Sequence, residues 1–551
     1  MALRDFRAPC TTGRLRIRSC RLRPCGVGSV TSHNETSGRA RMSAPAEEEY
    51  DAIVIGSGFG GCLAALPLVE AGASVLMLER GDWVVRGEHN WREEGAFVLT
   101  PHYTTESAYA RRTPMGWRQQ GLCACVGGPS VFYGGASFRF READFDTAPE
   151  ISTDPAACWP LGYAELEPFY GRVEKVLGIA GEPGVDPTEP ARSQPYGHRS
   201  PPLATVATRI AEAANSLGLR PFRIPMAIDA ARCHSCTTCD AFACAVSAKN
   251  DLATRLIPGM LARGMVLRPS TVVTRLGRSG SRVAFVDAVD AKTEARLRFR
   301  GELIVLAAGA LATPHLLLAS GLQNVSPGGS VIGRYLMRHC NAMTYGFFRS
   351  PPNAEDEHHK QLAIHDFYFG DPRLPDLGKL GNIQQVMAPP TGLVRALLPK
   401  ALAVPVGALV ANLTGLLVIA EDQPRSVNRV EVDSAVKDRF GLPGARIRHR
   451  YSRRDFAARA ALVRRAREIL RRAGSRFSLT WNVSTFSHAV GTVRMGNDAR
   501  ASALDRDCRF RGIDNLWVTD GSVFPTSGGV NPSLTIAANA LRVGTVLTRT
   551  A

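Results

Sequence analysis

The chain has 551 residues, 45% of them hydrophobic and 21% charged, so it is long enough for two or more domains with a large core. Its formal net charge of +17 suggests nucleic acid as a partner, but the excess lies in residues 1–41 and 446–476, which hold nine and twelve arginines. Because neither segment carries interleaved aromatic residues or a recognised module, nucleic-acid binding is disfavoured.

Residues 1–41 are rich in arginine, poor in acidic residues and broken by proline and glycine. They contain neither the apolar stretch of a secretory signal nor a twin-arginine pattern. We expect a disordered extension over residues 1–45, with Met42 as an alternative start and an organellar transit peptide as the rival interpretation. Thirteen cysteines without an export signal favour a reducing, cytoplasmic compartment.

A strand–turn–helix–strand pattern opens at Tyr50. The run AIVIG predicts a buried strand, and Gly56, Gly58 and Gly61 follow it with the spacing G-x-G-x-x-G. In this fingerprint the first glycine permits a tight turn, the second lets the backbone approach a pyrophosphate, and the third lets the helix pack on the strand. The next strand ends at Glu79, which can accept hydrogen bonds from both ribose hydroxyls. The stretch therefore predicts a site for a dinucleotide without a 2′-phosphate.

Three later segments also contain glycine turns. Residues 125–135, CVGGPSVFYGG, form a loop whose backbone can approach a flat or phosphorylated ligand. Residues 302–322 predict a buried strand, a glycine turn and a helix. Residues 515–544 predict a strand, an Asp-Gly turn, a loop and a helix that begins at NPSLT, with Asn531 as N-cap and Pro532 in the first helical position. Since the segments are far apart, we expect one nucleotide-binding domain assembled from separate pieces.

Four cysteines lie close together at Cys233, Cys236, Cys239 and Cys244. Their spacing suggests an iron–sulfur or zinc site, but a bacterial ferredoxin run has three residues before its last cysteine and then a proline. The spacing also leaves zinc little loop to fold around. We expect buried or redox-inert thiols and no metal, with an iron–sulfur cluster or zinc as the alternatives.

Two segments bear on membranes. Residues 401–420 carry no charge, but proline and glycine interrupt them, and their second half has the branched residues of a buried strand. Residues 453–474 predict an amphipathic helix. Its expected apolar stripe consists of Phe456, Ala460, Val463 and Leu470. A solvated basic face is the favoured interpretation of this helix, and a face on a membrane surface is the alternative.

Taken together, the motifs resemble the glucose–methanol–choline (GMC) family of FAD-dependent oxidoreductases from about residue 50 to residue 551. GALATPHLLLASGL matches a family signature except at its end, and SHAVGTVRMG resembles the catalytic-histidine segment. DNLWVTDGSVFPTSGGVNPSLT is most similar to the cholesterol oxidase and long-chain alcohol oxidase branch. The resemblance implies an α/β fold, with a Rossmann-like FAD-binding domain assembled from discontinuous segments and a mixed α+β substrate domain with an antiparallel sheet.

The resemblance also divides the chain. The FAD-binding domain is expected in residues 46–145, 255–335 and 486–551, and the substrate-binding domain in residues 146–254 and 336–485, with the cysteine segment at 233–244. The FAD contacts carried over by position are Gly56, Gly58, Gly61, Glu79, Gly127, Gly128, Ser130, Tyr133, Gly134, Val273, Asp520 and Gly521. Tyr133 replaces the Asn expected from cholesterol oxidases. The histidine that links flavin covalently in some members has no clear counterpart, so non-covalent FAD is expected.

Alcohol oxidation by a flavin moves a hydride from the carbinol carbon to flavin N5 while the hydroxyl loses its proton, so a proton acceptor is needed. The resemblance assigns this role to His488, since a neutral imidazole titrates near physiological pH. It assigns the orientation of the hydroxyl to Asn531. The positive end of the helix at NPSLT would face the charge that develops on the reduced flavin.

The expected substrate is a small lipophilic alcohol, either a sterol or a long-chain alcohol. The cholesterol-oxidase resemblance supports this, as does the apolar stretch 391–412, interpreted as extra core or as a lid that touches a bilayer. O2 or an electron-carrier protein is the expected acceptor, and peripheral membrane contact is the alternative to a purely cytoplasmic protein. The rival functions are a membrane-associated FAD dehydrogenase of a sugar or polyol, which passes electrons through a cysteine-ligated iron–sulfur cluster, and a non-catalytic flavin- or lipid-binding protein.

Overall fold

The structure is a computed structural model. It describes residues 48–91, 103–104, 108–236, 238–355, 357–358, 360–389, 391, 394–395 and 399–549. The expected disordered extension over residues 1–45 and the choice of start lie outside these residues. The chain from Pro45 onward forms one compact unit.

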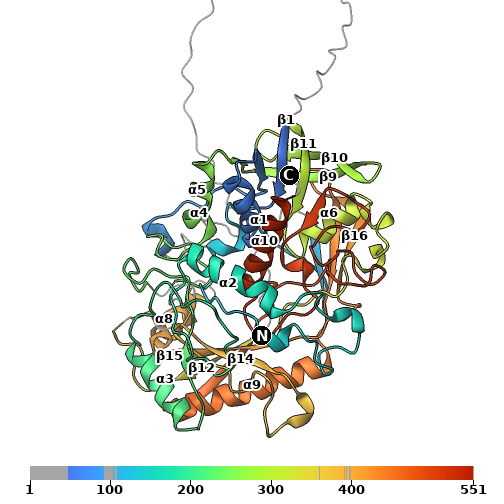
Figure 1. Cartoon of the computed structure of the whole chain (residues 1–551). Helices are drawn as coiled ribbons and strands as arrows, with labels where there is room; N and C mark the ends of the chain where they lie inside the picture. The colour runs from blue at the N-terminus through green and yellow to red at the C-terminus, as the bar shows by residue number, and fades with distance from the viewer. Residues whose placement is uncertain are drawn as a thin grey trace, which may run out of the picture. The chain divides into compact units, whose positions relative to one another are not determined.

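The first layer of this unit is a seven-stranded sheet (Figure 1). Its strands, in spatial order, are β8 (Val266–Arg268), β2 (Val75–Leu78), β1 (Glu48–Ile55), β11 (Arg296–Leu306), β10 (Arg282–Asp290) and β9 (Thr271–Ser279), and β19 (Leu516–Val518) pairs with β11. β1 runs parallel to β2 and β11, and its last four residues are buried. Such continuous apolar runs are typical of parallel strands covered on both faces. The sheet thus joins strands from distant parts of the chain.

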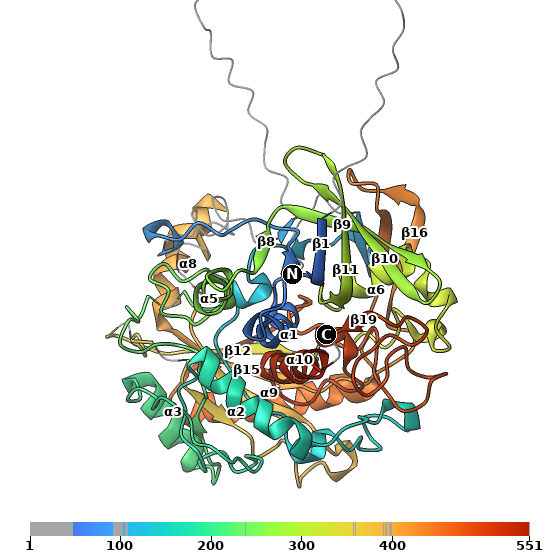
Figure 2. The same cartoon turned by 45° about the horizontal axis from the view of Figure 1, so that its top comes forward.

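Three helices lie together beside this sheet: α1 (Phe59–Glu70), α10 (Ser533–Leu547) and α2 (Tyr163–Leu177). Figure 2 shows α10 between the other two, and both of its neighbours contact it. The approach of α1 and α10 is close because Gly544 has no side chain: an added Cβ would overlap the carbonyl of Ala64. The other α-helices of the described residues are α3 (Thr205–Asn215), α4 (Leu252–Arg255), α5 (Ile257–Leu261), α6 (Ala312–Ala319), α8 (Lys400–Leu409) and α9 (Arg453–Arg472).

A six-stranded antiparallel sheet forms the second layer. Its strands, in order, are β18 (Phe477–Asn482), β12 (Ala342–Phe347), β15 (Leu413–Ala420), β14 (Gly381–Val386), β13 (Leu362–Ile364) and β7 (Phe222–Arg223). One face is covered by α9 and α3, whose apolar side chains share a core with Ala342, Ile383 and Val418. Because side chains alternate along a strand, Met343, Gln384 and their neighbours lie on the other face. The predicted fold class, including this antiparallel sheet, is confirmed.

The charge-free segment 401–420 divides into two elements. Its first half belongs to α8, and its second half is β15, the central strand predicted from the branched residues. Among the helices of the described residues, none combines the length and apolar character needed to cross a bilayer.

The basic helix predicted at residues 453–474 is present as α9, but of the four residues of its predicted apolar stripe only Val463 and Leu470 are buried. Phe456 is 45% exposed and Ala460 is also exposed, whereas Ala458, Leu462 and Ile469 are buried. The helix is rotated relative to this prediction, because its contacts with the six-stranded sheet and α3, rather than its largest side chain, determine which face is buried. Phe456 instead packs edge-on against the ring of Tyr451.

The other strands of the described residues form two smaller sheets. The four-stranded one consists of β16 (Arg429–Lys437), β17 (Pro443–Arg448), β4 (Tyr109–Thr113) and β5 (Gly116–Gln119), and the two-stranded one of β3 (Tyr103–Thr104) and β6 (Leu122–Cys123). In the four-stranded sheet, β4 from the predicted FAD-binding segment 46–145 pairs in parallel with β17 from the predicted substrate-binding segment 336–485. The two predicted domains therefore share a sheet, and the boundaries between them stay a prediction.

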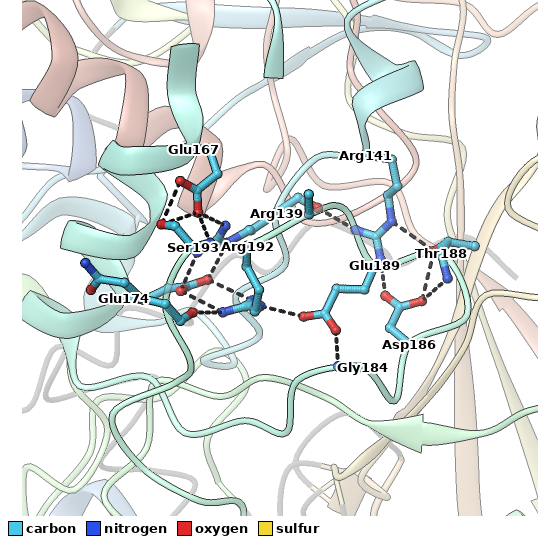
Figure 3. A network of polar contacts seen from close by, with 12 residues as sticks. Arg139, Arg141, Glu167, Glu174, Gly184, Asp186, Thr188, Glu189, Arg192 and Ser193 are labelled. Atoms are coloured by element: carbon cyan, nitrogen blue, oxygen red, sulfur yellow. Dashed lines mark hydrogen bonds and ion pairs between the residues drawn. The ribbon is translucent and has the colours of Figure 1, made fainter. Parts of the chain in front are cut away.

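Buried ion pairs hold Arg139 and Arg141, which follow the second glycine loop, in place (Figure 3). Arg139 donates to both carboxylate oxygens of Glu174 on α2, each at 2.8 Å, and Arg192 donates to the same two oxygens at 3.2 and 3.3 Å. Arg141 is paired with Asp186. Because burial removes water from these charges, each needs its partner. The network therefore fixes the course of the chain between the second glycine loop and the six-stranded sheet.

Candidate active site

The turn between β1 and α1 has the geometry of a dinucleotide cradle. Gly56 has φ +102°, and a Cβ there would overlap the carbonyl of Ala307, while a Cβ on Gly61 would overlap the carbonyl of Gly56. These two glycines are thus required by the backbone itself. Gly58 differs, because a Cβ there would meet only the Pro129 ring, at 3.9 Å. The backbone at Gly58 therefore lies open to a ligand, at the positive end of α1.

Glu79 lies at the carboxyl end of β2 beside this turn. Its carboxylate accepts from the backbone N–H and hydroxyl of Ser57, at 3.0 and 2.6 Å, and from the N–H of Gly81 at 2.9 Å. Burial raises the pKa of Glu79, whereas the bonds from Gly81 and Ser57 lower it. A carboxylate has about four lone-pair positions. One therefore remains for a ribose hydroxyl, fewer than the two that the sequence suggests.

The second glycine loop lies against the first. Gly127 and Gly128 both have positive φ, and the N–H of Gly127 donates to the Ser57 hydroxyl at 2.9 Å. Ser130 is fully buried: its hydroxyl donates to the Gly127 carbonyl at 2.6 Å and accepts from the N–H of Leu252 at 3.1 Å. The two glycine motifs, about seventy residues apart in the chain, thus form one surface.

Tyr133 and Gly134 continue the same loop toward the cysteine segment. The Tyr133 hydroxyl donates to the Asn250 carbonyl at 2.8 Å, which explains how a tyrosine is accommodated here. A Cβ on Gly134 would overlap the ion pair between Lys360 and Asp240, whose atoms are 2.6 Å apart. Gly134 therefore lets the loop approach a charge pair in which Lys360 is buried and Asp240 is partly exposed.

The remaining predicted cofactor residues reach the same region from other strands. Asp520 follows β19, and its carboxylate accepts from the N–H groups of Gly309 and Ser522, each at 2.8 Å. The carbonyl of Gly521 accepts from the N–H of Gly491 at 3.0 Å. Val273 lies on β9, two residues after Thr271, whose N–H donates to the Glu79 carbonyl at 2.8 Å. Asp520 thus braces two loops with its side chain.

The cradle fits a dinucleotide. The observation that decides this is the contrast between Gly58, where the structure leaves space beside the backbone, and Gly56 and Gly61, where it leaves none. α1 also begins without a side-chain cap, so its first N–H groups are available to a phosphate.

His488 and Asn531, which the sequence predicts as the catalytic pair, are brought together. Asn531 Nδ2 lies 3.4 Å from His488 Nε2, and the Asn531 Oδ1 accepts from Gln384 Nε2 at 2.7 Å. The prediction that Asn531 caps the last helix is wrong: α10 begins at Ser533 with Pro532 in the cap position. The amide of Asn531 is used by Gln384 and His488 instead.

His488 is kept neutral. Burial lowers the pKa of His488 to about 3, and the neighbouring His339 and Lys360 lower it further, while Asp422 opposes the shift. His339 Nδ1 is 2.9 Å from His488 Nδ1. A neutral imidazole with one nitrogen toward Asn531 is able to accept a proton.

The cysteine segment packs on the second glycine loop. The ammonium of Lys249 donates to the carbonyls of Tyr133, Cys239 and Phe242 at 2.7 to 2.8 Å. All four thiols are free, and burial raises the pKa of the Cys239 thiol to about 12. Within the described ranges, no group of three or more His, Cys, Asp or Glu side chains is placed to hold a metal ion. The cysteine segment thus lies beside the second glycine loop.

His339, Gln384 and Ser57 are residues that the motifs did not predict. Ser57 lies inside the glycine fingerprint, at a position that the fingerprint leaves unspecified. Gln384 is one of several polar residues in an ordinary strand, and His339 follows an Arg with no recognisable spacing. For these last two residues, contacts with chain segments about 150 residues away are the informative signal, and one sequence does not contain it.

The open dinucleotide cradle and the His–Asn pair define a cofactor-dependent oxidoreductase. Two family models, both described as GMC oxidoreductase, match residues 50–341 and 424–540. The chain belongs to the GMC oxidoreductase family, and it is an FAD-dependent oxidoreductase that acts on CH–OH groups.

Among the curated relatives, 6'''-hydroxyparomomycin C oxidase from Streptomyces lividus is 31% identical over 90% of this chain and 91% of its own length. The 2-methyl-1,2-propanediol dehydrogenase of Mycolicibacterium austroafricanum is 29% identical over 91% of this chain and 96% of its own. Fructose dehydrogenase large subunit from Gluconobacter japonicus is 24% identical over 89% of this chain and 96% of its own. These relatives do not single out the cholesterol oxidase and long-chain alcohol oxidase branch.

Solved structures show the same fold. Pyridoxine 4-oxidase from Mesorbium loti superposes with a TM-score of 0.63 at 19% identity, covering 91% of this chain and 99% of its own. An FAD-dependent oxidoreductase from Chaetomium thermophilum gives a TM-score of 0.59 at 17% identity, with the same coverage of both chains.

Replacing Gly61 by Ala should abolish cofactor binding, because the new Cβ overlaps the Gly56 carbonyl and pushes α1 from β1. We expect Gly61→Ala to purify with less than about a tenth of the wild-type flavin absorbance per protein. The control is Gly259→Ala, where a Cβ meets nothing within 4 Å, and it should retain full flavin. A flavin-loaded Gly61→Ala protein would contradict this account of the cradle.

Proposed function

We propose that the protein oxidises a neutral, largely apolar alcohol, with non-covalent FAD as the hydride acceptor. The observation that carries the proposal is the uncharged face of the six-stranded sheet, which begins at the His488–Asn531 pair. A lipophilic alcohol such as a sterol or a long-chain alcohol fits this face better than a charged substrate.

The strand register defines the face. Directly paired residues lie on the same side of a sheet. One row therefore crosses from the site to the free edge in the order Gln384, Leu417, Met343 and Trp481. Across three strand spacings this row spans about 14 Å. A substrate body of that length can rest on the sheet while its hydroxyl meets His488.

The face is apolar and accessible. Along the edge strand β18, Phe477, Leu479 and Trp481 are 53%, 62% and 58% exposed, and Met343 and Tyr345 on β12 are half-buried. No residue of β12, β14, β15 or β18 is charged. Exposed aromatic and aliphatic side chains grouped on one face are typical of a binding surface.

This composition also bears on whether the substrates named for two relatives suit this chain. Two of them are named as an oxidase of 6'''-hydroxyparomomycin C and a 6'-oxidase of paromamine. The ammonium groups of an amino sugar need carboxylate partners when they leave water. These four strands offer none, and the Asp240 carboxylate that acts on Tyr345 is already paired with Lys360, so an amino sugar is disfavoured as the substrate of this chain.

The chain's residues divide the chemistry between them. FAD, when bound, accepts the hydride from the carbinol carbon. Neutral His488 accepts the hydroxyl proton at Nε2, and the Asn531 amide, held by Gln384, donates to the hydroxyl oxygen and fixes its direction. Removing the proton is essential because an alcohol left to ionise in water does so only at very high pH.

The first experiment is an anaerobic panel of a sterol, a long-chain alcohol, a vicinal diol and an amino sugar, scored by bleaching of the flavin band. We expect the first two to bleach it at the lowest concentrations. Trp481→Ala should raise the KM for the long-chain alcohol by about tenfold, because part of an indole's apolar contact is lost. Trp117→Ala, on the four-stranded sheet, is the matched control and should leave KM unchanged.

Preferred reduction by the amino sugar, or an unaltered KM in Trp481→Ala, would refute the apolar assignment. The same samples test the remaining parts of the proposal. A spectrum taken before substrate shows flavin bands alone if the thiols are inert, and a further broad absorption if they ligate an iron–sulfur cluster. Peroxide formed in air identifies O2 as the acceptor, and its absence identifies an electron carrier. Flavin released by denaturation shows non-covalent binding.

The lowered pKa of His488 gives a pH dependence. A base with a free-enzyme pKa of about 3 is unprotonated at every pH above about 4. For a substrate without titrating groups, kcat/KM should therefore show no decrease from protonation of His488 between pH 8 and pH 5, and should fall only below about pH 4. An ordinary exposed histidine would produce a fall centred near pH 6.5. A fall in kcat/KM centred near pH 6.5 that is present in wild type and absent from His488→Gln would contradict the lowered pKa of His488.

A further inference from the structure

The ring of His339 lies directly behind His488. Its Nε2 is 3.1 and 3.0 Å from the carbonyl oxygens of Ser527 and Gly528, and its Nδ1 is 2.9 Å from His488 Nδ1. A carbonyl oxygen only accepts, so Nε2 of His339 carries a hydrogen. In a neutral His339 the lone pair is then at Nδ1. Since two nitrogens 2.9 Å apart require one hydrogen between them, that hydrogen belongs to Nδ1 of His488.

The hydrogen bonds on the other side of His488, which run from Gln384 through Asn531, indicate the same position for its hydrogen. Gln384 Nε2 donates to Asn531 Oδ1 at 2.7 Å, so the amide nitrogen of Asn531 is the atom turned toward His488. An amide nitrogen donates only, and it faces Nε2 of His488 at 3.4 Å. Nε2 of His488 must therefore present a lone pair. The two ends, reached by independent contacts, assign one tautomer to His488.

The protein holds His339 by its backbone as well as by its ring. Its φ is +57°, in the left-handed region that few non-glycine residues adopt. Its N–H donates to Asp422 Oδ1 at 3.0 Å, and the Tyr451 hydroxyl donates to its carbonyl at 2.6 Å. The residue is 1% exposed. A costly backbone conformation, held from both sides at a proposed catalytic centre, indicates that the ring position is used.

The charged groups nearby make their hydrogen bonds to partners other than the His339 ring. Asp422 accepts from the backbone N–H of Arg338 and His339 and lies 3.5 Å from His449, so its contacts are with other groups than the His339 ring. Lys360 adds positive charge near His488. A cationic His339 would place its Nδ1 hydrogen toward His488 and force the His488 hydrogen onto Nε2, against the N–H of Asn531.

We infer that His339 is a positioning residue, which fixes His488 as the tautomer with its hydrogen at Nδ1 and its lone pair at Nε2. This inference rests on the proposed role of His488 as base. When the alcohol is oxidised, its O–H bond breaks and the proton passes to His488 Nε2. The carbinol C–H bond breaks and its hydride goes to FAD, leaving a carbonyl. His488 is then an imidazolium whose Nδ1–H still donates to His339.

The tautomer can be measured without substrate, by 15N NMR of the histidine-labelled holoenzyme at pH 7. The His488 signals are assigned by their absence from His488→Gln. We expect the spectrum to show a hydrogen on His488 Nδ1 and none on Nε2, and a hydrogen on Nε2 would overturn the inference. If no alcohol proves to be a substrate, the proposed function fails, but the measured tautomer of His488 still tests the inference about His339 independently.

Kinetics of His339 variants test the consequence. His339→Ala removes the acceptor, and we expect kcat to fall by about 100-fold or more with KM within about threefold of wild type, since a wrongly oriented base still allows binding. His339→Asn tolerates the left-handed backbone and supplies Oδ1 in place of Nδ1. It should recover kcat to within about tenfold of wild type.

The matched control is His315→Asn, a buried histidine bonded to Tyr109 and Pro443, which should leave kcat unchanged. Flavin content is measured in each variant. A flavin-loaded His339→Ala with wild-type kcat would overturn the inference, as would a His339→Asn that shows no recovery over His339→Ala. If His339→Ala does not fold, the spectrum of the wild-type protein and the kinetics of His339→Asn decide.

Discussion

The structure depends on how the loop 527–531 is held between the two large sheets. This loop leaves the region of β19 and enters α10, and it carries Asn531. From β14 of the six-stranded sheet, the side chains of Asn382 and Gln384 donate to it, and the hydroxyl of Tyr368, between β13 and β14, accepts from it. From the segment before β12, the ring of His339 donates to its carbonyls. The spacing between the cofactor cradle and the substrate face is therefore set by hydrogen bonds to one short loop.

That arrangement explains how the proposed catalytic pair can be polar in a partly buried setting. Unpaired polar groups in a protein interior cost free energy, whereas a completed chain of donors and acceptors stabilises one orientation of every group. Here each link, from Gln384 through Asn531 and His488 to His339, has a donor facing an acceptor. The pair is thus oriented before a substrate arrives, which is what an efficient proton acceptor requires.

The substrate face follows from the same sheet. Its far side must be apolar to pack on α9, and its near side must carry Asn382 and Gln384 to the loop. Near the free edge at β18, the side chains on this face neither pack on α9 nor support the loop. Phe477, Leu479 and Trp481 are nevertheless apolar and exposed. Packing and loop support account for the first two sets of residues. We propose that binding of an apolar substrate body accounts for the third.

Part of the fold and part of the candidate site could be predicted from the sequence. The glycine fingerprint and Glu79 were identified because their chemistry lies within thirty consecutive residues. The helix α9 and the strand β15 were predicted from local periodicity and composition. The full buried side of α9, the hydrogen bond by which Gln384 holds the Asn531 amide and the contact of His339 with His488 were not, because each is decided by segments far away in the chain. Local patterns thus locate the cofactor cradle, whereas the orientation of the base depends on tertiary contacts.

The most direct test of the account is an experimental structure of the FAD-loaded protein with an unreactive apolar alcohol bound. We expect the alcohol hydroxyl within about 2.6–3.2 Å of both His488 Nε2 and Asn531 Nδ2, and the apolar body of the alcohol along the row from Leu417 to Trp481. A hydroxyl that meets neither nitrogen, or a body that lies away from the six-stranded sheet, would contradict it.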